Sequence, residues 1–123
     1  MGVRVNVGDD AVDIAFTGMD RWVTLNRRGQ HIAMADITSA RVAPVAEVRS
    51  DTGLRVGGSY WPGRFATGWF NVKGQKGKRQ LWCVYRDPEV LVIETQLDRP
   101  CRVVLQTPNR HDIAWYIGER LGR

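Results

Sequence analysis

The residue types that most often carry out chemistry are sparse in this chain of 123 residues. The two histidines, His31 and His111, lie far apart in the sequence, and the only cysteines are Cys83 and Cys101. Two cysteines without a second pair do not make a zinc site, and in a reducing compartment they favour two buried free thiols. The chain also lacks the Gly-x-Ser-x-Gly, His-Glu-x-x-His and Cys-x-x-Cys motifs. The sequence therefore predicts no metal site, no cofactor and no catalytic residues.

Two further patterns are typical of catalysis or nucleotide binding, but the neighbouring residues argue against both. Asp9, Asp10 and Asp13 are close in sequence, yet they flank the start of a predicted strand, where turn chemistry explains them. The glycines from Gly58 to Gly63 have the spacing of a phosphate-binding loop. However, Arg64-Phe65 stands where that loop needs Lys and then Ser or Thr. We therefore expect that the protein is not an enzyme.

The distribution of charge is more informative than any motif. Residues 1–60 carry seven basic and seven acidic residues, whereas residues 61–123 carry eleven and six, so the net charge of +5 comes from the second half. No acidic residue occurs between Asp51 and Asp87, an interval that holds seven of the eleven aromatic residues. All the lysines of the chain surround one predicted hairpin turn in this interval, and they are Lys73, Lys76 and Lys78.

This basic and aromatic interval has two interpretations. A cationic hairpin beside aromatic side chains suits an anionic partner, either anionic lipid or nucleic acid. Alternatively, the aromatic residues build the core of a sheet, and the lysines keep an exposed hairpin soluble and unpaired. The candidate surface for an anion or a partner consists of Lys73, Lys76, Lys78, Arg79, Arg64, Tyr60 and Trp61.

The hydrophobic pattern has mostly a period of two, which is typical of half-buried strands. It predicts an extra N-terminal strand at Val3–Val7 and about seven further strands, at Val12–Phe16, Arg21–Leu25, His31–Val42 with an interruption at Ala35-Asp36, Phe65–Lys73, Lys78–Arg86, Val90–Thr95 and Cys101–Gln106. The segments on either side of Gly74–Gly77 suit an antiparallel hairpin. The glycine-rich stretch Ser50–Gly68 has no clean period, so we expect a long loop there.

Only the end of the chain has the period of a helix. The apolar residues that would share one helical face are Ile113, Tyr116, Ile117 and Leu121. Thr107 is a candidate N-cap, Pro108 suits the first helical position, and Gly122 lies near the expected end. The sequence therefore predicts a C-terminal helix over about 108–121.

Length and composition are typical of one compact soluble domain that spans residues 1–123. Hydrophobic residues make up 43% of the chain and charged residues 25%, which are globular averages. The longest plain apolar run, Val90–Ile93, is far too short to span a membrane as a helix. The first residues lack the hydrophobic region of a secretory leader. We expect a cytoplasmic protein without a transmembrane segment, and peripheral contact with a membrane stays open.

Three stretches of the chain carry a resemblance to a known family, and they are Phe16–Arg21, Gly53–Gly63 with Gly68–Phe70, and Val90–Glu94 leading to Arg102–Leu105. These stretches resemble the bacterial pleckstrin-homology-like (PH-like) domain proteins, which are mostly of unknown function. The likeness spans most of residues 11–121 and consists of glycines and apolar positions. It implies a mainly β fold, a seven-stranded antiparallel barrel or sandwich capped by one C-terminal helix, and no catalytic residues.

One departure from the resemblance bears on the ligand. Members of the wider superfamily that bind phosphoinositides have a long first hairpin loop rich in Lys and Arg, whereas here Gly18-Met19-Asp20 is short and contains an acid. We therefore expect a non-catalytic interaction module that binds a protein partner or associates with itself, because exposed sheet edges and an aromatic loop suit strand docking. The alternative is peripheral binding of anionic lipid or nucleic acid through the basic hairpin at residues 73–79.

Overall fold

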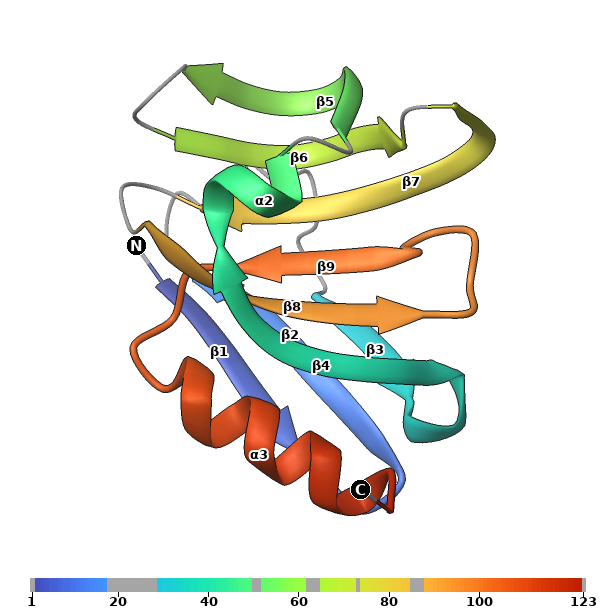
Figure 1. The fold of residues 1–123 in the computed structure, drawn as a ribbon, viewed down its shortest axis with the longest axis vertical. Coiled ribbons are helices and arrows are strands. Elements are labelled where there is room, and N and C mark those ends of the chain that lie inside the picture. The colour runs from blue at the N-terminus through green and yellow to red at the C-terminus, as the bar shows by residue number, and fades with distance from the viewer. Residues whose placement is uncertain are drawn as a thin grey trace.

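The computed structural model describes residues 2–17, 29–49, 52–61, 65–72, 74–84 and 88–122. In chain order the elements are β1 (Gly2–Val7), β2 (Ala11–Thr17), β3 (Gln30–Ala33), the 3-10 turn η1 (Met34–Asp36), β4 (Ile37–Pro44), α2 (Val45–Arg49), β5 (Thr52–Trp61), β6 (Phe65–Val72), β7 (Gln75–Val84), β8 (Glu89–Thr95), β9 (Arg102–Leu105) and α3 (Arg110–Arg120) (Figure 1). The prediction of a mainly β fold with a C-terminal helix is confirmed. The strand predicted at Arg21–Leu25 lies outside the described residues.

The described strands form two sheets and do not close into a barrel. One sheet has the order β1-β2-β3 and the other has the order β4-β8-β9-β7-β6-β5, so there are nine described strands, where seven and an extra N-terminal strand were predicted. The sheet is also not purely antiparallel, because β9 runs parallel to β7, with Gln80 opposite Arg102. The strand β9 lies between β8 and β7, and it pairs antiparallel with β8 on its other side. Periodicity locates strands but does not specify their neighbours.

The long loop predicted at Ser50–Gly68 is wrong, because much of this stretch belongs to β5 and β6. These strands pair antiparallel, with the register shifting around Arg55 and with Gly58 directly opposite Gly68. Shifts of register interrupt the alternation of a strand, and glycines often mark such places. The period of two was therefore absent from a segment that is nevertheless a strand.

The predicted hairpin of β6 and β7 is confirmed. Val72 pairs with Gln75 at the turn, and the register then shifts, so that Asn71 pairs with Arg79 and the continuous ladder begins there. Gly74 has a φ of +78°, a conformation that glycine adopts without steric cost.

The central strands β7, β8 and β9 of the six-stranded sheet are buried on both faces. The three-stranded sheet and α3 cover one face, where the main core consists of Val12, Ile14, Phe16, Ile32, Met34, Ile37, Leu81, Cys83, Leu91, Ile93, Val103, Leu105, Ile113 and Ile117. The opposite face contains a second cluster, to which α2 contributes Val48: Ala43, Val48, Phe70, Trp82, Val84, Val90, Val92 and Val104. Burial on both faces explains why Val90–Ile93 is a continuous apolar run.

The C-terminal helix α3 packs against β4, β1 and β8 and thus covers the open side of the two-sheet core (Figure 1). The helix begins at Arg110, and Asn109 rather than Thr107 occupies the N-cap, so the predicted cap is wrong. Thr107 is instead buried before the helix. Gly122, with a φ of +81°, follows the end of the helix as predicted. None of the described helices is long and apolar enough to cross a membrane.

Candidate functional site

The basic surface predicted from the sequence is described only in part. Lys78 is exposed on β7, and the neighbouring Arg79 is half-buried. Both residues lie at the register shift of β7, where Val72 pairs with Gln75 and Asn71 pairs with Arg79. Of the remaining predicted residues, Lys73 and Arg64 lie outside the described residues, and only backbone positions are described for Lys76, Tyr60 and Trp61.

The two cysteines are free thiols in different environments. Cys83 is buried, as predicted, whereas Cys101 is only half-buried. Burial raises the pKa of the Cys101 thiol, although Arg102 and Lys78 act in the opposite direction. Because the thiolate is the nucleophilic form, a raised pKa lowers the reactivity of this cysteine at neutral pH.

A network of three charged residues joins the strands β4, β8 and β9. Glu94 accepts hydrogen bonds from Arg41 Nη1 at 3.0 Å and from Arg102 Nε at 2.8 Å. Burial opposes ionisation of Glu94, but the bonds to both arginines outweigh it, and the pKa of the carboxyl is lowered. The carboxylate is therefore charged and bonded on both oxygens, which suits a cross-strand clamp rather than an acid or base.

Each histidine lies beside a carboxylate at the surface. His31 Nδ1 is 2.5 Å from Asp13 Oδ1, directly across β2 and β3, and His111 Nε2 is 3.0 Å from Glu89 Oε1. A hydrogen bond from Arg110, together with His111, lowers the pKa of Glu89. Both imidazoles are about 70% exposed. No group of three or more His, Cys, Asp or Glu side chains suited to a metal ion occurs among the described residues.

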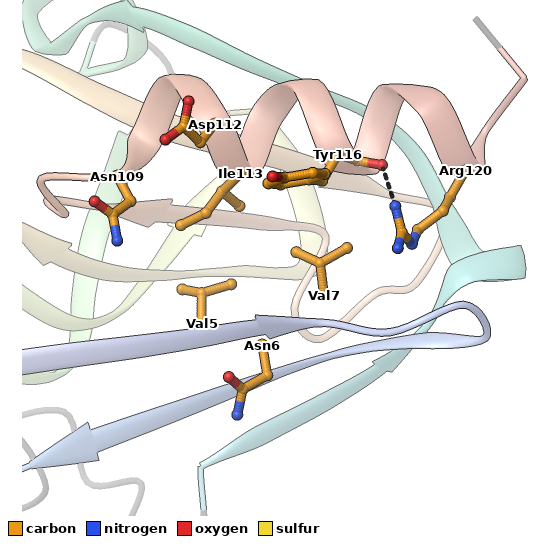
Figure 2. A pocket seen from close by; sticks show the side chains of 8 residues that line it. All are labelled: Val5, Asn6, Val7, Asn109, Asp112, Ile113, Tyr116 and Arg120. Atoms are coloured by element: carbon orange, nitrogen blue, oxygen red, sulfur yellow. Dashed lines mark hydrogen bonds between the residues drawn. The ribbon is translucent and has the colours of Figure 1, made fainter.

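A groove of about 500 Å³ lies between β1 and α3 (Figure 2). The residues that line it are Val5, Asn6, Val7, Asn109, Asp112, Ile113, Tyr116 and Arg120. None of these residues belongs to the surface predicted from the sequence. The groove is therefore a candidate site that only the tertiary structure identifies.

The groove follows the backbone edge of β1. Val5 and Val7 point toward α3, whereas Asn6 points away from the helix, yet all three residues line the groove (Figure 2). Because the Asn6 side chain points away from the helix, the groove borders the backbone of β1 at this residue. β1 is the end strand of its sheet and pairs on one side with β2.

The hydrogen-bond pattern identifies the backbone groups at this edge. Gly8 N–H donates to Ala11 O at 2.9 Å, and this bond continues the register of β1 and β2. In an antiparallel ladder the residues alternate between those that bond to the partner strand and those that point away from it. The N–H and C=O groups of Val3, Val5 and Val7 therefore point away from β2. An additional strand would need these groups as its hydrogen-bonding partners.

The far wall of the groove is an aromatic part of α3. Tyr116 lines the groove at 47% exposure, and the adjacent Trp115 is 60% exposed. Their rings make an edge-to-face contact with 5.3 Å between centroids. Among the residues whose side-chain exposure is described, these two are the exposed large apolar side chains. Tyr116 was expected on the buried helical face, and this expectation is wrong, because the buried stripe is centred on Ile113 and Ile117.

Arg120 connects α3 to the turn after β1 at one end of the groove. Its Nε donates to Gly8 O at 2.9 Å and its Nη1 donates to Tyr116 O at 3.3 Å. The guanidinium also lies 5.9 Å from the centroid of the Tyr116 ring, and its Nη2 is 3.6 Å from Asp9 Oδ1. These contacts fix the orientation of a cationic group beside the last residues of β1.

Comparison with known proteins does not assign the groove a function. Protein-family models, curated proteins and solved structures give no significant match to this chain.

Proposed function

We propose that this chain is a non-catalytic, PH-like interaction module that binds an extended segment of a partner protein by strand addition to β1. The observation that carries the proposal is the groove along the outer edge of β1. An extended peptide that joins a sheet edge gains main-chain hydrogen bonds, and pockets for alternate side chains provide specificity.

The walls of the groove suit such a segment. An added strand places every second side chain on the face of Val5 and Val7, so these side chains would contact Ile113 and Tyr116 on α3. The three β1 valines are half-buried and pack at the margin of the core. An apolar residue at alternate positions of the segment would complete their burial.

The helix also limits the size of the occupant. Because α3 forms the far wall, the groove accommodates a single extended segment more readily than the edge of a second folded sheet. This favours a flexible or terminal region of a partner over association with a second copy. Sedimentation velocity over a range of concentrations tests the alternative, since a dimer that Val5→Pro abolishes would make self-association the function of this edge.

The proposal is tested with random octapeptides displayed on phage and selected against the folded protein. We expect enriched peptides to have aliphatic residues at alternate positions and to lose binding to Val5→Pro, which lacks one edge N–H. N-methylation of successive peptide amides should then weaken binding at every second position. Failure to enrich any peptide, or equal binding to Val5→Pro and the unmodified chain, would contradict strand addition.

The alternative from the sequence concerns the basic hairpin. Lys78 is exposed, as a contact with anionic lipid or nucleic acid requires. This alternative predicts salt-sensitive binding to phosphatidylserine vesicles or to a short DNA duplex, reduced by Lys78→Gln. A cytoplasmic location likewise stays a prediction.

A further inference from the structure

We infer that the segment bound along β1 is the free C-terminus of a partner protein, running parallel to β1 with its terminal carboxylate at Arg120. This inference rests on the proposed function, because it needs the β1 edge as the docking site. It adds the direction of the segment, the group at its end and the residue that recognises that group.

The first argument is that the groove is bridged at one end. The hydrogen bond from Arg120 Nε to Gly8 O crosses from α3 to the turn that follows β1. A segment that lies along Val5 and Val7 meets this bridge directly beyond Val7 (Figure 2). A chain terminus fits such an end, whereas an internal segment would have to turn out of the groove.

The second argument concerns direction. Asn109, at the start of α3, lies near Val5, and Arg120, at the end of α3, lies beyond Val7, so helix and strand run the same way (Figure 2). A peptide parallel to β1 brings its carboxyl end to Arg120. An antiparallel peptide would have its first residue at Arg120, and its terminal ammonium group would then lie beside the guanidinium. Like charges repel each other, so this direction is unfavourable.

The third argument is the donor capacity of Arg120. A guanidinium carries five N–H donors in a fixed fork that matches a carboxylate. The described contacts are two hydrogen bonds to carbonyl oxygens and a looser contact to Asp9 at 3.6 Å. Two hydrogen bonds hold the group in place and leave further N–H donors for an anion.

Asp9 makes a sharper test possible. Its carboxylate is 94% exposed and lies beyond hydrogen-bond distance of Arg120. It is therefore the described carboxylate that a ligand carboxylate would compete with at this guanidinium. Replacement of Asp9 by Asn removes this competing charge and leaves the groove lining unchanged.

The experiment compares three fluorescein-labelled peptides by fluorescence anisotropy. The first is Thr-Val-Thr-Val-Thr-Val with a free carboxyl end, the second is the same peptide with a carboxamide end, and the third is the carboxamide with Glu as its last residue. We expect the free acid to bind about tenfold more tightly than the first carboxamide, because hydrogen bonds to a charged group are the strong ones. We expect the Glu peptide to bind no better than that carboxamide.

Variants then assign the effect to Arg120. In Arg120→Gln the ratio of the affinities for the free acid and the carboxamide should fall to less than about twofold. Arg120→Lys should retain only part of the preference for the free acid, because Lys lacks the bidentate fork. In Asp9→Asn the ratio should rise. Thermal denaturation of each variant establishes that it is folded, and the ratio in the unmodified chain tests the inference without any variant.

The outcomes separate the two proposals. Equal binding of acid and carboxamide, with N-methylation still acting at every second position, would overturn C-terminal recognition and leave strand addition intact. Tight binding of the Glu peptide would overturn it in favour of an internal acidic residue. If neither these peptides nor the displayed library binds, both proposals fail.

Discussion

The strands β1 and β9 are both rich in valine, yet they differ in almost every structural respect. β9 lies between β8 and β7 and pairs on both sides, and Val103, Val104 and Leu105 have no exposed surface. Among the described strands β1 pairs with β2 alone, and its valines are only half-buried. The difference shows that position in the sheet, rather than residue type, determines how much surface a valine buries.

The same contrast explains why the candidate site lies where it does. In β9 the backbone edges are occupied by β7 and β8, and the side chains of Val103, Val104 and Leu105 lie in the two cores, so these three residues offer no group to a ligand. At β1 the outward-pointing backbone groups border a groove. Exposed strand edges are prone to unwanted pairing, and covering them with a helix or loop limits this tendency. Here α3 lies beside β1, and the groove remains open between the helix and the strand.

The largest expected effect is on stability. Leu105→Ala in β9 should lower the free energy of unfolding by about 3 kcal/mol, because it leaves a cavity in a fully buried site. Val5→Ala in β1 should cost about 1 kcal/mol, since the deleted methyl groups are only partly buried. Urea denaturation measures both values. Equal losses would mean that β1 is as firmly packed as β9.

A pair of proline substitutions tests the two sides of β1. Asn6→Pro removes an N–H that bonds to β2 and should lower the free energy of unfolding by about 2 kcal/mol, because the carbonyl group on β2 loses its hydrogen-bond donor. Val5→Pro removes an N–H that points to the groove, so it should cost less than Asn6→Pro. Denaturation in urea, with circular dichroism as the probe, gives the difference. The reverse order would contradict the assignment of the free edge.

Amide hydrogen exchange sharpens the comparison without any substitution. The amides of Arg4 and Asn6 bond within the sheet and should exchange about tenfold or more slowly than those of Val5 and Val7. The amides of Val103 and Val104 should both be protected, since β9 pairs on both sides. Uniform protection along β1 would indicate that its outer edge is already occupied.

The smallest effect is expected from the charge network that reaches β9. The pKa of Glu94 is lowered in the folded chain, so its stabilising contribution is present at neutral pH and is lost as the pH falls through the folded value. Both its partners are partly exposed, which keeps the contribution below about 1 kcal/mol. Glu94→Gln should therefore flatten the acid limb of the melting temperature, whereas Asp9→Asn, at a fully solvated side chain, should not. Parallel acid limbs for Glu94→Gln and the unmodified chain would contradict a stabilising network.

Most elements were predictable because their signal is local. The alternation at Val3–Val7 and Val12–Phe16, the continuous apolar run at Val90–Ile93 and the helical spacing of Ile113 and Ile117 all correspond to described elements. β5 was missed because register shifts and glycines interrupt its alternation. The helix N-cap was misplaced because Thr107 has the right chemistry but is buried before the helix begins.

The candidate site could not be predicted in the same way. The sequence drew attention to Lys73, Lys76 and Lys78 because charge and composition are visible without a structure. The groove combines β1 with α3, two elements at opposite ends of the chain, and no local pattern indicates that they are adjacent. The one available signal was Tyr116, a residue with a polar end at the margin of a predicted apolar helical face.

By itself, then, the sequence determined the periodic elements, because a period of 2 or 3.6 in apolar residues can be recognised within a single segment of the chain. Only the tertiary structure decided which strand ends a sheet, that β9 lies parallel to β7, and that Arg120 meets the turn after β1. These features depend on contacts between residues far apart in the chain, and their free energies come from burial and hydrogen bonds that form only once the whole core has assembled.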